Sequence, residues 1–352
     1  MYKIGYNNSV KHYGAETHYE KPDRLGYCID ELQKNINSSN FIDLSQLDMH
    51  KTLNLISQVH SKEYLSRIKD FKSKIFICRG CGKKNNSSNP ITFSDFICAV
   101  KECGNCSNQV DLDNLYCYVS IDTYYTAYTY QIALEGVSVI LLLLDTMKSN
   151  IKINASFALV RPPGHHCNND PNGFCIFNNV FIGAKYAQSV GWKKVLILDI
   201  DFHHGDGTQA LIQSDEDPDI SFVSIHGYGE RIYPGTGKIS SPDDNILNIP
   251  LNMNLDTDSR LYITDEYYQN ILVTQAFPFI NQQNPDLIII SLGFDAHQND
   301  PLEGMNISDE TYLFVTNELK KLSKPLLFVT EGGYNVKTIR RLIPKMINLF
   351  DK

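Results

Sequence analysis

The chain has 352 residues, of which 42% are hydrophobic, and this is enough for one large α/β domain or two smaller ones. Its 32 basic and 40 acidic residues give a formal net charge of −8, which argues against direct nucleic-acid binding and suits a cationic substrate such as a lysine-rich tail. The first ten residues lack the charged-then-apolar pattern of a secretory signal, and the longest apolar run, residues 137–144, is too short to span a bilayer. We therefore expect an intracellular protein of the nucleus or cytoplasm that is neither secreted nor bound to a membrane.

Two pairs of cysteines mark an insertion at about residues 76–113, where the sequence has little periodicity and a polar, turn-rich middle. Cys78 and Cys81 form one CxxC pair, Cys103 and Cys106 form another, and 21 residues separate the pairs. Cysteines stay reduced inside cells, and this spacing is typical of a zinc ribbon in which four thiolates close a structural site. We expect such a four-cysteine element here, and the alternative is free thiols or disulfides.

The rest of the chain alternates between helical and strand-like apolar patterns. A long pattern at residues 124–147 predicts a buried helix. Short apolar runs that predict buried parallel strands occupy residues 157–160, 195–199, 220–226, 287–291 and 325–330. This alternation predicts an α/β fold with an open sheet, in one domain that surrounds the insertion, and a ligand site at the carboxyl ends of the strands.

A metal site is predicted directly after two of these strands. Asp201 and His203 follow the run at 195–199 and are two residues apart, so their side chains point the same way in an extended segment. Asp295 follows the run at 287–291 and can supply a third ligand. Carboxylate oxygens and imidazole nitrogens suit Zn²⁺, and three protein ligands leave a position for water or substrate, as a catalytic zinc requires.

Groups suited to acid-base chemistry are predicted after two other strands. His165 and His166 lie on a Pro-Gly turn, where imidazoles can transfer protons near a metal, and Asp199 and Asp206 are available to orient them. Tyr334 follows the last strand in the segment TEGGYN, and its phenol can donate a hydrogen bond to a carbonyl oxygen. A polar histidine loop, or a tyrosine packed beside a Gly-Gly turn, is the plainer interpretation of each motif by itself.

Taken together, the motifs make the sequence similar to the histone deacetylase family, and more narrowly to its class II-like members and their bacterial amidohydrolase relatives. The matching segments, in chain order, are HYEKPDRL, VHSKEYL, DTYYTAYTYQIAL, RPPGHHCNNDPNGFCIFNNV, DIDFHHGDGTQ, SIHGYGERIYPGTG, SLGFDAHQNDPL and EGGYN. They cover nearly the whole chain, residues 1–352, outside the insertion. The resemblance implies a three-layer α/β/α sandwich around a mostly parallel eight-stranded sheet, as in arginase. It also implies zinc-dependent hydrolysis of N-acetyl groups from acetyl-lysine in proteins such as histones, with release of acetate.

The resemblance gives a role to each matching residue. The catalytic zinc ligands would be Asp201, His203 and Asp295. The catalytic set would be His166 as general base and acid with Asp206 as its partner, His165 as an electrostatic helper backed by Asp199, and Tyr334 as the group that polarises the carbonyl. The acetyl-lysine tunnel would be lined by the aromatic walls Phe174 and Tyr233 and by Gly173, Leu302 and Gly332. A potassium site would be formed by Asp199, Asp201, His203, Ser224 and Ile225, partly through backbone carbonyls.

Three departures from the family pattern affect the tunnel and leave the zinc chemistry intact. Tyr233 stands where the family commonly has Phe, Cys167 stands where Ala is usual, and the loop from His166 to Gly173 is one residue short. The main alternative function is hydrolysis of acetylpolyamines or other small N-acyl amines at the same site. Arginase-like binuclear manganese chemistry lacks enough carboxylates at the matching positions, and a pure binding module has no reason to keep the complete catalytic set.

Overall fold

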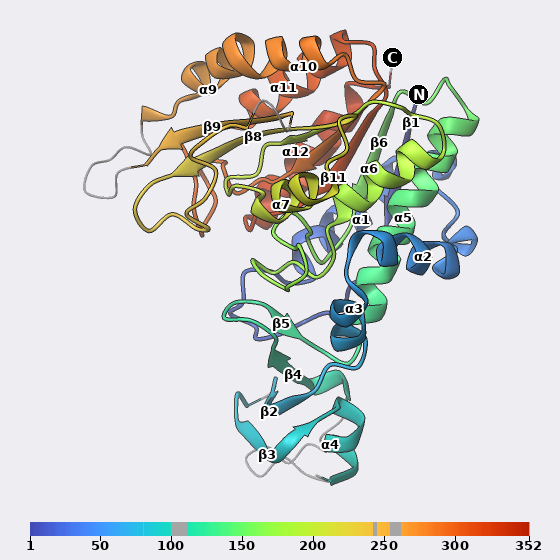
Figure 1. Ribbon diagram of the computed structural model, residues 1–352, viewed down its shortest axis with the longest axis vertical. Helices are drawn as coiled ribbons and strands as arrows, with labels where there is room; N and C mark the ends of the chain where they lie inside the picture. Colours follow the sequence, from blue (N-terminus) through green and yellow to red (C-terminus); the bar gives the residue numbers. More distant parts are fainter. Residues whose placement is uncertain (80, 100–111, 242–244, 254–261, 352) are drawn as a thin grey trace.

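Seven strands form the central sheet of the computed structural model, which describes residues 1–79, 81–99, 112–241, 245–253 and 262–351 (Figure 1). In spatial order they are β1 (Tyr2–Tyr6), β6 (Ala155–Leu159), β11 (Leu326–Thr330), β10 (Leu287–Leu292), β7 (Val195–Asp199), β8 (Ile220–Tyr228) and β9 (Ile246–Asn252). Every neighbouring pair is parallel. All the carboxyl ends therefore lie at the same end of the sheet, which is where ligand sites of α/β folds form.

The structure confirms the predicted α/β fold and corrects the number of strands. All five apolar runs are strands, and the buried helix predicted at residues 124–147 is α5 (Thr129–Ser149), although its predicted first residues, Tyr124–Tyr125, form a short strand instead. The main sheet has seven strands in the described part of the chain, not eight, and they are parallel throughout. The two strands that the sequence did not reveal, β1 and β9, are the outermost ones. Each mixes buried and half-buried residues, and Pro250 lies within β9, so neither has the continuous apolar run of a central strand.

Helices cover both faces of the sheet and so complete three layers (Figure 1). One face is covered by α1 (Asp23–Asn35), α9 (Asp265–Ile271), α10 (Phe277–Gln283), α11 (Asp309–Lys321) and α12 (Val336–Asn348), with a π-helical turn at Leu272–Ala276. The other is covered by α5, α6 (Asn179–Ser189) and α7 (Asp206–Asp215), with α2 (Met49–Val59) packed against α5 and α6, and α3 (Lys62–Lys69) follows α2 in the chain. Successive strand residues alternate between the two cores, as Ile288 and Ile289 do, because side chains along a strand point to opposite faces.

The long helix α5 is apolar on nearly all sides because protein surrounds it. It packs against α2, α6, β1 and β6. A helix with this environment needs no polar face. In the part of the chain that the structure describes, no helix combines the length and apolar character needed to cross a membrane.

A second, antiparallel sheet projects from the main body, and the first cysteine pair lies in it (Figure 1). Its spatial order is β3 (Lys84–Ile91), β2 (Ser73–Cys78), β4 (Leu115–Tyr118) and β5 (Tyr124–Tyr125), and helix α4 (Phe93–Ala99) follows β3 in the chain. Phe76 stacks on Phe96 with 4.4 Å between ring centroids and meets Phe93 edge-on at 5.1 Å, which gives the unit a small aromatic core. The sequence did not reveal β3 because it reads KNNSSNPI and is almost wholly polar.

The first cysteine pair lies where the chain turns from β2 to β3. Cys78 is buried at the end of β2, and Cys81 is exposed in the turn. Gly82 donates its N–H to the Cys78 carbonyl at 2.8 Å, and its φ of +68° favours glycine. Cys103 and Cys106 lie outside the described residues, so the structure bears only on the first pair.

Phe328 provides a test of the core beneath the site. Its ring stacks on Phe157 with 4.7 Å between centroids and is buried. We expect Phe328→Ala to lower the free energy of unfolding by about 3–5 kcal/mol, because a large buried side chain is lost and a cavity is left. Urea unfolding at equilibrium measures the change. Ile239→Ala is the control, because Ile239 is 76% exposed and its loss should change the free energy by about 0.5 kcal/mol or less. Equal effects of the two substitutions would contradict this description of the core.

Candidate active site

Loops at the carboxyl ends of four neighbouring strands bring the candidate residues together. The order of these strands in the sheet is β6, β11, β10, β7. The loop after β6 carries His165 and His166, the loop after β11 carries Tyr334, the loop after β10 carries Asp295, and the loop after β7 carries Asp201 and His203. Residues that are far apart in the sequence therefore face one another across the end of the sheet.

Asp201, His203 and Asp295 converge on one point. One potential ligand atom from each lies within 4.8 Å of the other two, and all three side chains are buried. His203 Nδ1 lies 3.1 Å from Asp201 Oδ1 and 3.1 Å from Asp295 Oδ2. The backbone fixes the remaining oxygens, since Gly332 donates its N–H to Asp201 Oδ2 at 2.8 Å and Phe202 donates to Asp295 Oδ1 at 2.8 Å. The three donors are thus already oriented toward a shared cation.

This donor set fits a zinc ion. Burial, together with the neighbouring Asp201 carboxylate, raises the pKa of Asp295 to about 7, because two carboxylates in an apolar site repel each other. A divalent cation would offset that repulsion. One imidazole nitrogen and two carboxylate oxygens are ligands that zinc accepts, and a set of three leaves a coordination position for water or substrate.

The two adjacent histidines each have a carboxylate partner. His165 Nδ1 lies 3.0 Å from Asp199 Oδ2, and His166 Nδ1 lies 2.7 Å from Asp206 Oδ1. Burial lowers the pKa of His165, but the Asp201 and Asp199 carboxylates outweigh it and raise that pKa to about 10. Burial and the adjacent His165 lower the pKa of His166 to about 4, against the opposite effect of Asp206. The pair therefore consists of one cationic ring and one neutral ring that can accept a proton at Nε2.

Two glycines allow the loops to close tightly around these groups. A Cβ atom on Gly332 would lie 2.2 Å from Asp295 Oδ2, and a Cβ atom on Gly173 would lie 2.3 Å from His166 Cδ2. Gly173 also has a φ of +50°, which side chains other than glycine rarely adopt. A larger residue at either position would displace a metal donor or an imidazole.

The site opens into a cavity of about 250 Å³. Its lining residues are Asp122, Pro163, His165, His166, Gly173, Phe174, His203, Tyr233, Leu302, Glu303, Gly332 and Tyr334. Phe174 meets Tyr334 edge-on with 5.8 Å between ring centroids, and Tyr233 meets His166 edge-on at 4.9 Å. All five residues predicted for the tunnel therefore face the same cavity as the histidine pair and Tyr334.

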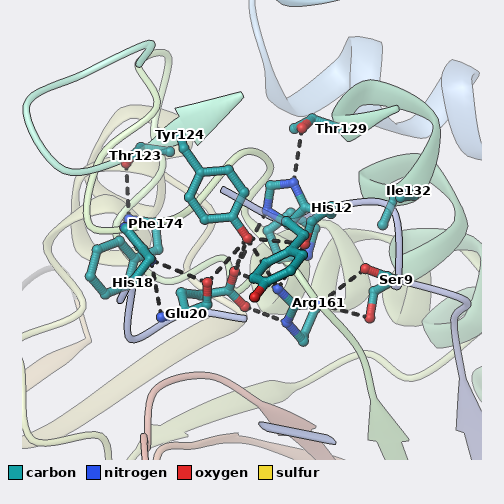
Figure 2. A network of polar contacts seen from close by, with 12 residues as sticks. Ser9, His12, His18, Glu20, Thr123, Tyr124, Thr129, Ile132, Arg161 and Phe174 are labelled. Carbon is teal, nitrogen blue, oxygen red and sulfur yellow. Dashed lines mark hydrogen bonds and ion pairs between the residues drawn. The ribbon is translucent and has the colours of Figure 1, made fainter. Parts of the chain in front are cut away.

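A buried cluster of charged residues is centred on Glu20 (Figure 2). Both carboxylate oxygens of Glu20 accept hydrogen bonds from Arg161, at 2.5 and 2.7 Å, and the Tyr124 hydroxyl donates to the same carboxylate at 2.8 Å. Arg24 donates to it at 3.1 Å. Glu20 and the two arginines are at most 1% exposed, so each charge depends on its partners inside the protein.

Arg24 connects this cluster to the tyrosine loop. It donates hydrogen bonds to the carbonyls of Glu331 at 2.5 Å and Gly333 at 2.6 Å. Its guanidinium also lies 4.9 Å from the centre of the Tyr334 ring. The segment that precedes α1 therefore holds the loop from which the Tyr334 phenol projects.

A row of aromatic contacts connects the same cluster to the cavity wall (Figure 2). His18 meets Tyr124 at 4.8 Å and Phe174 at 4.9 Å between ring centroids, edge-on in both cases. Phe174 also donates its backbone N–H to the Thr123 hydroxyl at 3.0 Å and has a φ of +69°. His18, which contacts the ring, and Thr123, which holds the backbone, therefore fix Phe174 in its position on the cavity wall.

The residues assigned to a potassium site lie at the same end of the sheet. Asp199 ends β7 and is paired in register with Ser224 of β8, and Ile225 is the next residue of β8. The Asp199 carboxylate also accepts the backbone N–H of Asp201 at 3.1 Å. The structure thus brings these residues together beside the zinc donors.

Sequence reasoning missed several residues that support the site. Glu331 Oε2 accepts the backbone N–H groups of Gly164 at 2.6 Å and His165 at 3.2 Å and so anchors the histidine turn. Glu331 lies within the segment EGGYN, and Glu20 and Arg24 lie within HYEKPDRL, so the matching segments contained all three residues without indicating their contacts. Glu303 lines the cavity but stands in a loop outside these segments.

Comparisons with known proteins agree with this arrangement. A family model for the histone deacetylase domain matches residues 18–350. Histone deacetylase 14 of Arabidopsis thaliana, described as chloroplastic, is 36% identical over 62% of this chain and 52% of its own length. An uncharacterized Methanocaldococcus jannaschii protein is 30% identical over 96% of this chain and 84% of its own. The crystal structure of the HDA15 HD domain has a TM-score of 0.75 and 25% sequence identity, covering 99% of this chain and 90% of that one.

The chain spans a little over half the length of several curated relatives that it matches. The family model nevertheless extends over almost all of this chain, and the fold agrees with that of a solved family domain. The buried donor group of Asp201, His203 and Asp295 is consistent with the zinc site of such hydrolases. The chain therefore belongs to the histone deacetylase family.

Proposed function

We propose that the protein is a zinc-dependent deacetylase that hydrolyses N-acetyl groups of acetyl-lysine in proteins such as histones, with release of acetate. One observation carries the proposal: His203 of the cation-binding triad, His166 and Tyr334 all face one cavity walled by Phe174 and Tyr233, and Asp201 and Asp295 converge on His203. Acyl transfer to water requires an electrophile, a base and an oxyanion donor within reach of one carbonyl, and this cavity supplies a group for each.

The mechanism assigns each step to a residue of the cavity. When bound, a zinc ion at the three donors supplies a Lewis acid for the acyl carbonyl and lowers the pKa of its water. His166 Nε2 takes a proton from the attacking water and then donates it to the amine nitrogen as the C–N bond breaks. Asp206 holds the His166 ring in place, and the cationic His165, backed by Asp199, adds positive charge beside the reaction.

Tyr334 is proposed to stabilise the oxyanion. Burial raises the pKa of Tyr334 well above its ordinary value, so the phenol keeps its proton. It can therefore donate a hydrogen bond to the carbonyl oxygen as negative charge develops there. The products are acetate and a free amine.

The remaining parts of the proposal concern the cavity wall, a second cation and the subclass. Gly173, Phe174, Tyr233, Leu302 and Gly332 would surround the acyl-amine chain. Asp199, Ser224 and Ile225, with Asp201 and His203, would hold a potassium ion that balances buried carboxylate charge. The segments RPPGHH and EGGY favour a class II-like member.

The alternative substrate is an acetylated polyamine or another small N-acyl amine. Tyr233 favours this alternative in one respect. Its hydroxyl is buried in the wall, and in the described part of the chain it forms no hydrogen bond within the usual limits of distance and angle. A substrate with a polar group along its chain would satisfy that hydroxyl, and a purely methylene chain would not. Turnover of an acetyl-lysine peptide compared with acetylated polyamines distinguishes the two.

Removal of a metal donor tests the zinc assignment. Asp201→Ala or His203→Ala should abolish turnover of an acetyl-lysine peptide and remove one zinc ion per chain, because two donors cannot replace three. Metal analysis and a deacetylation assay measure both effects, and circular dichroism checks the fold. His50→Ala, at an exposed histidine away from the site, should leave both unchanged. Near-normal turnover by either donor variant after loss of its zinc would refute the assignment.

The phenol of Tyr334 can be tested separately from its ring. Tyr334→Phe keeps the ring contacts with Arg24 and Phe174 and removes only the hydroxyl. Turnover should fall about 10²–10³-fold with little change in KM, because the hydrogen bond strengthens mainly as charge develops. Tyr27→Phe, at a tyrosine that is 51% exposed, is the matched control. Unchanged turnover of Tyr334→Phe would leave Tyr334 as a packing residue only.

We also propose a structural zinc at Cys78, Cys81, Cys103 and Cys106, in an inserted element at about residues 76–113. The tight turn at Gly82, which follows the first pair, supports the proposal.

The proposed four-cysteine site predicts how many zinc ions each chain holds. Intact protein should hold two zinc ions per chain, and Cys78→Ser with Cys81→Ser should hold one. Deacetylation of whole proteins should fall more than that of a short peptide, because Asp122, in the loop that joins β4 to β5, lines the cavity. Cys117→Ser, in the same small sheet, should keep both ions. A single zinc in the intact protein would refute the four-cysteine site.

A further inference from the structure

Glu303 is a carboxylate of the cavity wall that lies beside a zinc donor. Its Oε1 is 3.9 Å from Nε2 of His203, and the side chains of Glu303 and His203 are 17% and 8% exposed. The residue also lines the 250 Å³ cavity together with His203 and Tyr334. No role in the mechanism above uses this carboxylate.

The orientation of the His203 ring determines what its second nitrogen must do. Nδ1 faces the two aspartate donors at 3.1 Å each, so Nδ1 is the nitrogen that would bind the metal. A neutral imidazole that binds a cation through one nitrogen carries its proton on the other. The Nε2–H of His203 therefore points away from the metal, from a ring that is almost completely buried, and needs an acceptor.

The short loop after Asp295 presents Glu303 to that N–H. Asp300, which is 8% exposed, accepts the backbone N–H groups of Leu302 at 3.0 Å and Glu303 at 3.4 Å through one carboxylate oxygen. Its other oxygen accepts the backbone N–H of Tyr334 at 2.6 Å. The loop after Asp295 is therefore braced internally and tied to the tyrosine loop. From this fixed backbone, rotation about a side-chain torsion of Glu303 can shorten 3.9 Å to a hydrogen bond.

The other two imidazoles of the cavity follow the same arrangement. His165 has Asp199 on one ring nitrogen and His166 has Asp206, each within hydrogen-bond distance. Histidine ligands of metals commonly donate their second N–H to a carboxylate, which fixes the ring and raises its basicity as a ligand. Glu303 is the carboxylate placed to do this for His203.

We propose that Glu303 is a positioning residue that accepts a hydrogen bond from His203 Nε2–H and holds the ring in the orientation and tautomer that bind zinc. This inference rests on the proposed zinc site. It assigns Glu303 an effect on metal affinity and ligand geometry, and no direct contact with the substrate is needed.

The test measures zinc affinity directly, by competition with a chromophoric chelator in metal-free protein that is then titrated with zinc. Glu303→Ala should weaken binding at the catalytic site about 10–100-fold, and Glu303→Gln should weaken it less, because an amide oxygen can accept the hydrogen bond without its charge. Cobalt substitution gives a second readout, and the visible spectrum of the Glu303→Ala variant should change shape. Asp122→Asn is the matched control, because Asp122 is a carboxylate of the same cavity and zinc affinity should not change.

Several results would overturn the proposal. Parental zinc affinity in Glu303→Ala, or a change only in the thermal unfolding of the metal-free protein, would show that Glu303 does not position the ligand. A higher KM for cationic substrates with unchanged zinc affinity would place Glu303 against the substrate instead. If the parent binds zinc and Glu303→Ala weakens it, but no acyl-amine is hydrolysed, the proposed function fails while the role of Glu303 stands. If the parent deacetylates and zinc affinity is unaffected, only the role of Glu303 fails.

Discussion

Buried negative charge at the carboxyl ends of the central strands is the constraint on which the rest of the site depends. Asp199, Asp201, Asp295 and Glu331 are each at most 1% exposed, and isolated buried carboxylates are strongly destabilising. Backbone N–H groups and the cationic ring of His165 satisfy part of this charge. The charge that remains on the converging donors suits a divalent cation, and binding of such a cation would be thermodynamically linked to folding at this end of the sheet.

The same charge distribution separates two histidines that are adjacent in the sequence. Against the effect of burial, the Asp201 and Asp199 carboxylates raise the pKa of His165, whereas burial and the adjacent His165 lower the pKa of His166, whose carboxylate partner is Asp206. Proton transfer requires a ring that can accept a proton, and electrostatic stabilisation requires one that keeps it. The two roles therefore follow from the position of each ring relative to the buried carboxylates. Substitution of either carboxylate partner, Asp199 or Asp206, should alter both roles.

The sequence predicted the parts of this protein whose signals are local. Central strands such as β7 and β10 are buried on both faces and appear as apolar runs, and Asp201, His203 and Asp295 follow them directly. The outer strands β1 and β9 and the polar strand β3 lack that signal. Contacts such as Glu20 with Arg161, or Glu303 with His203, join segments about 100 or more residues apart, so only the fold reveals them.

The small antiparallel sheet contacts the wall of the cavity, and it does not contact the candidate metal donors through the hydrogen bonds described. The loop between β4 and β5 contains Asp122, which lines the cavity, and Thr123, whose hydroxyl accepts the N–H of Phe174. The candidate metal donors Asp201, His203 and Asp295 follow β7 and β10, and in the described part of the chain their hydrogen bonds go to other segments than this loop. A displacement of the small sheet would therefore move the Phe174 wall while the donors keep their geometry. Structural changes in the small sheet should then alter substrate fit, measured as KM, before they alter the geometry of the candidate metal donors.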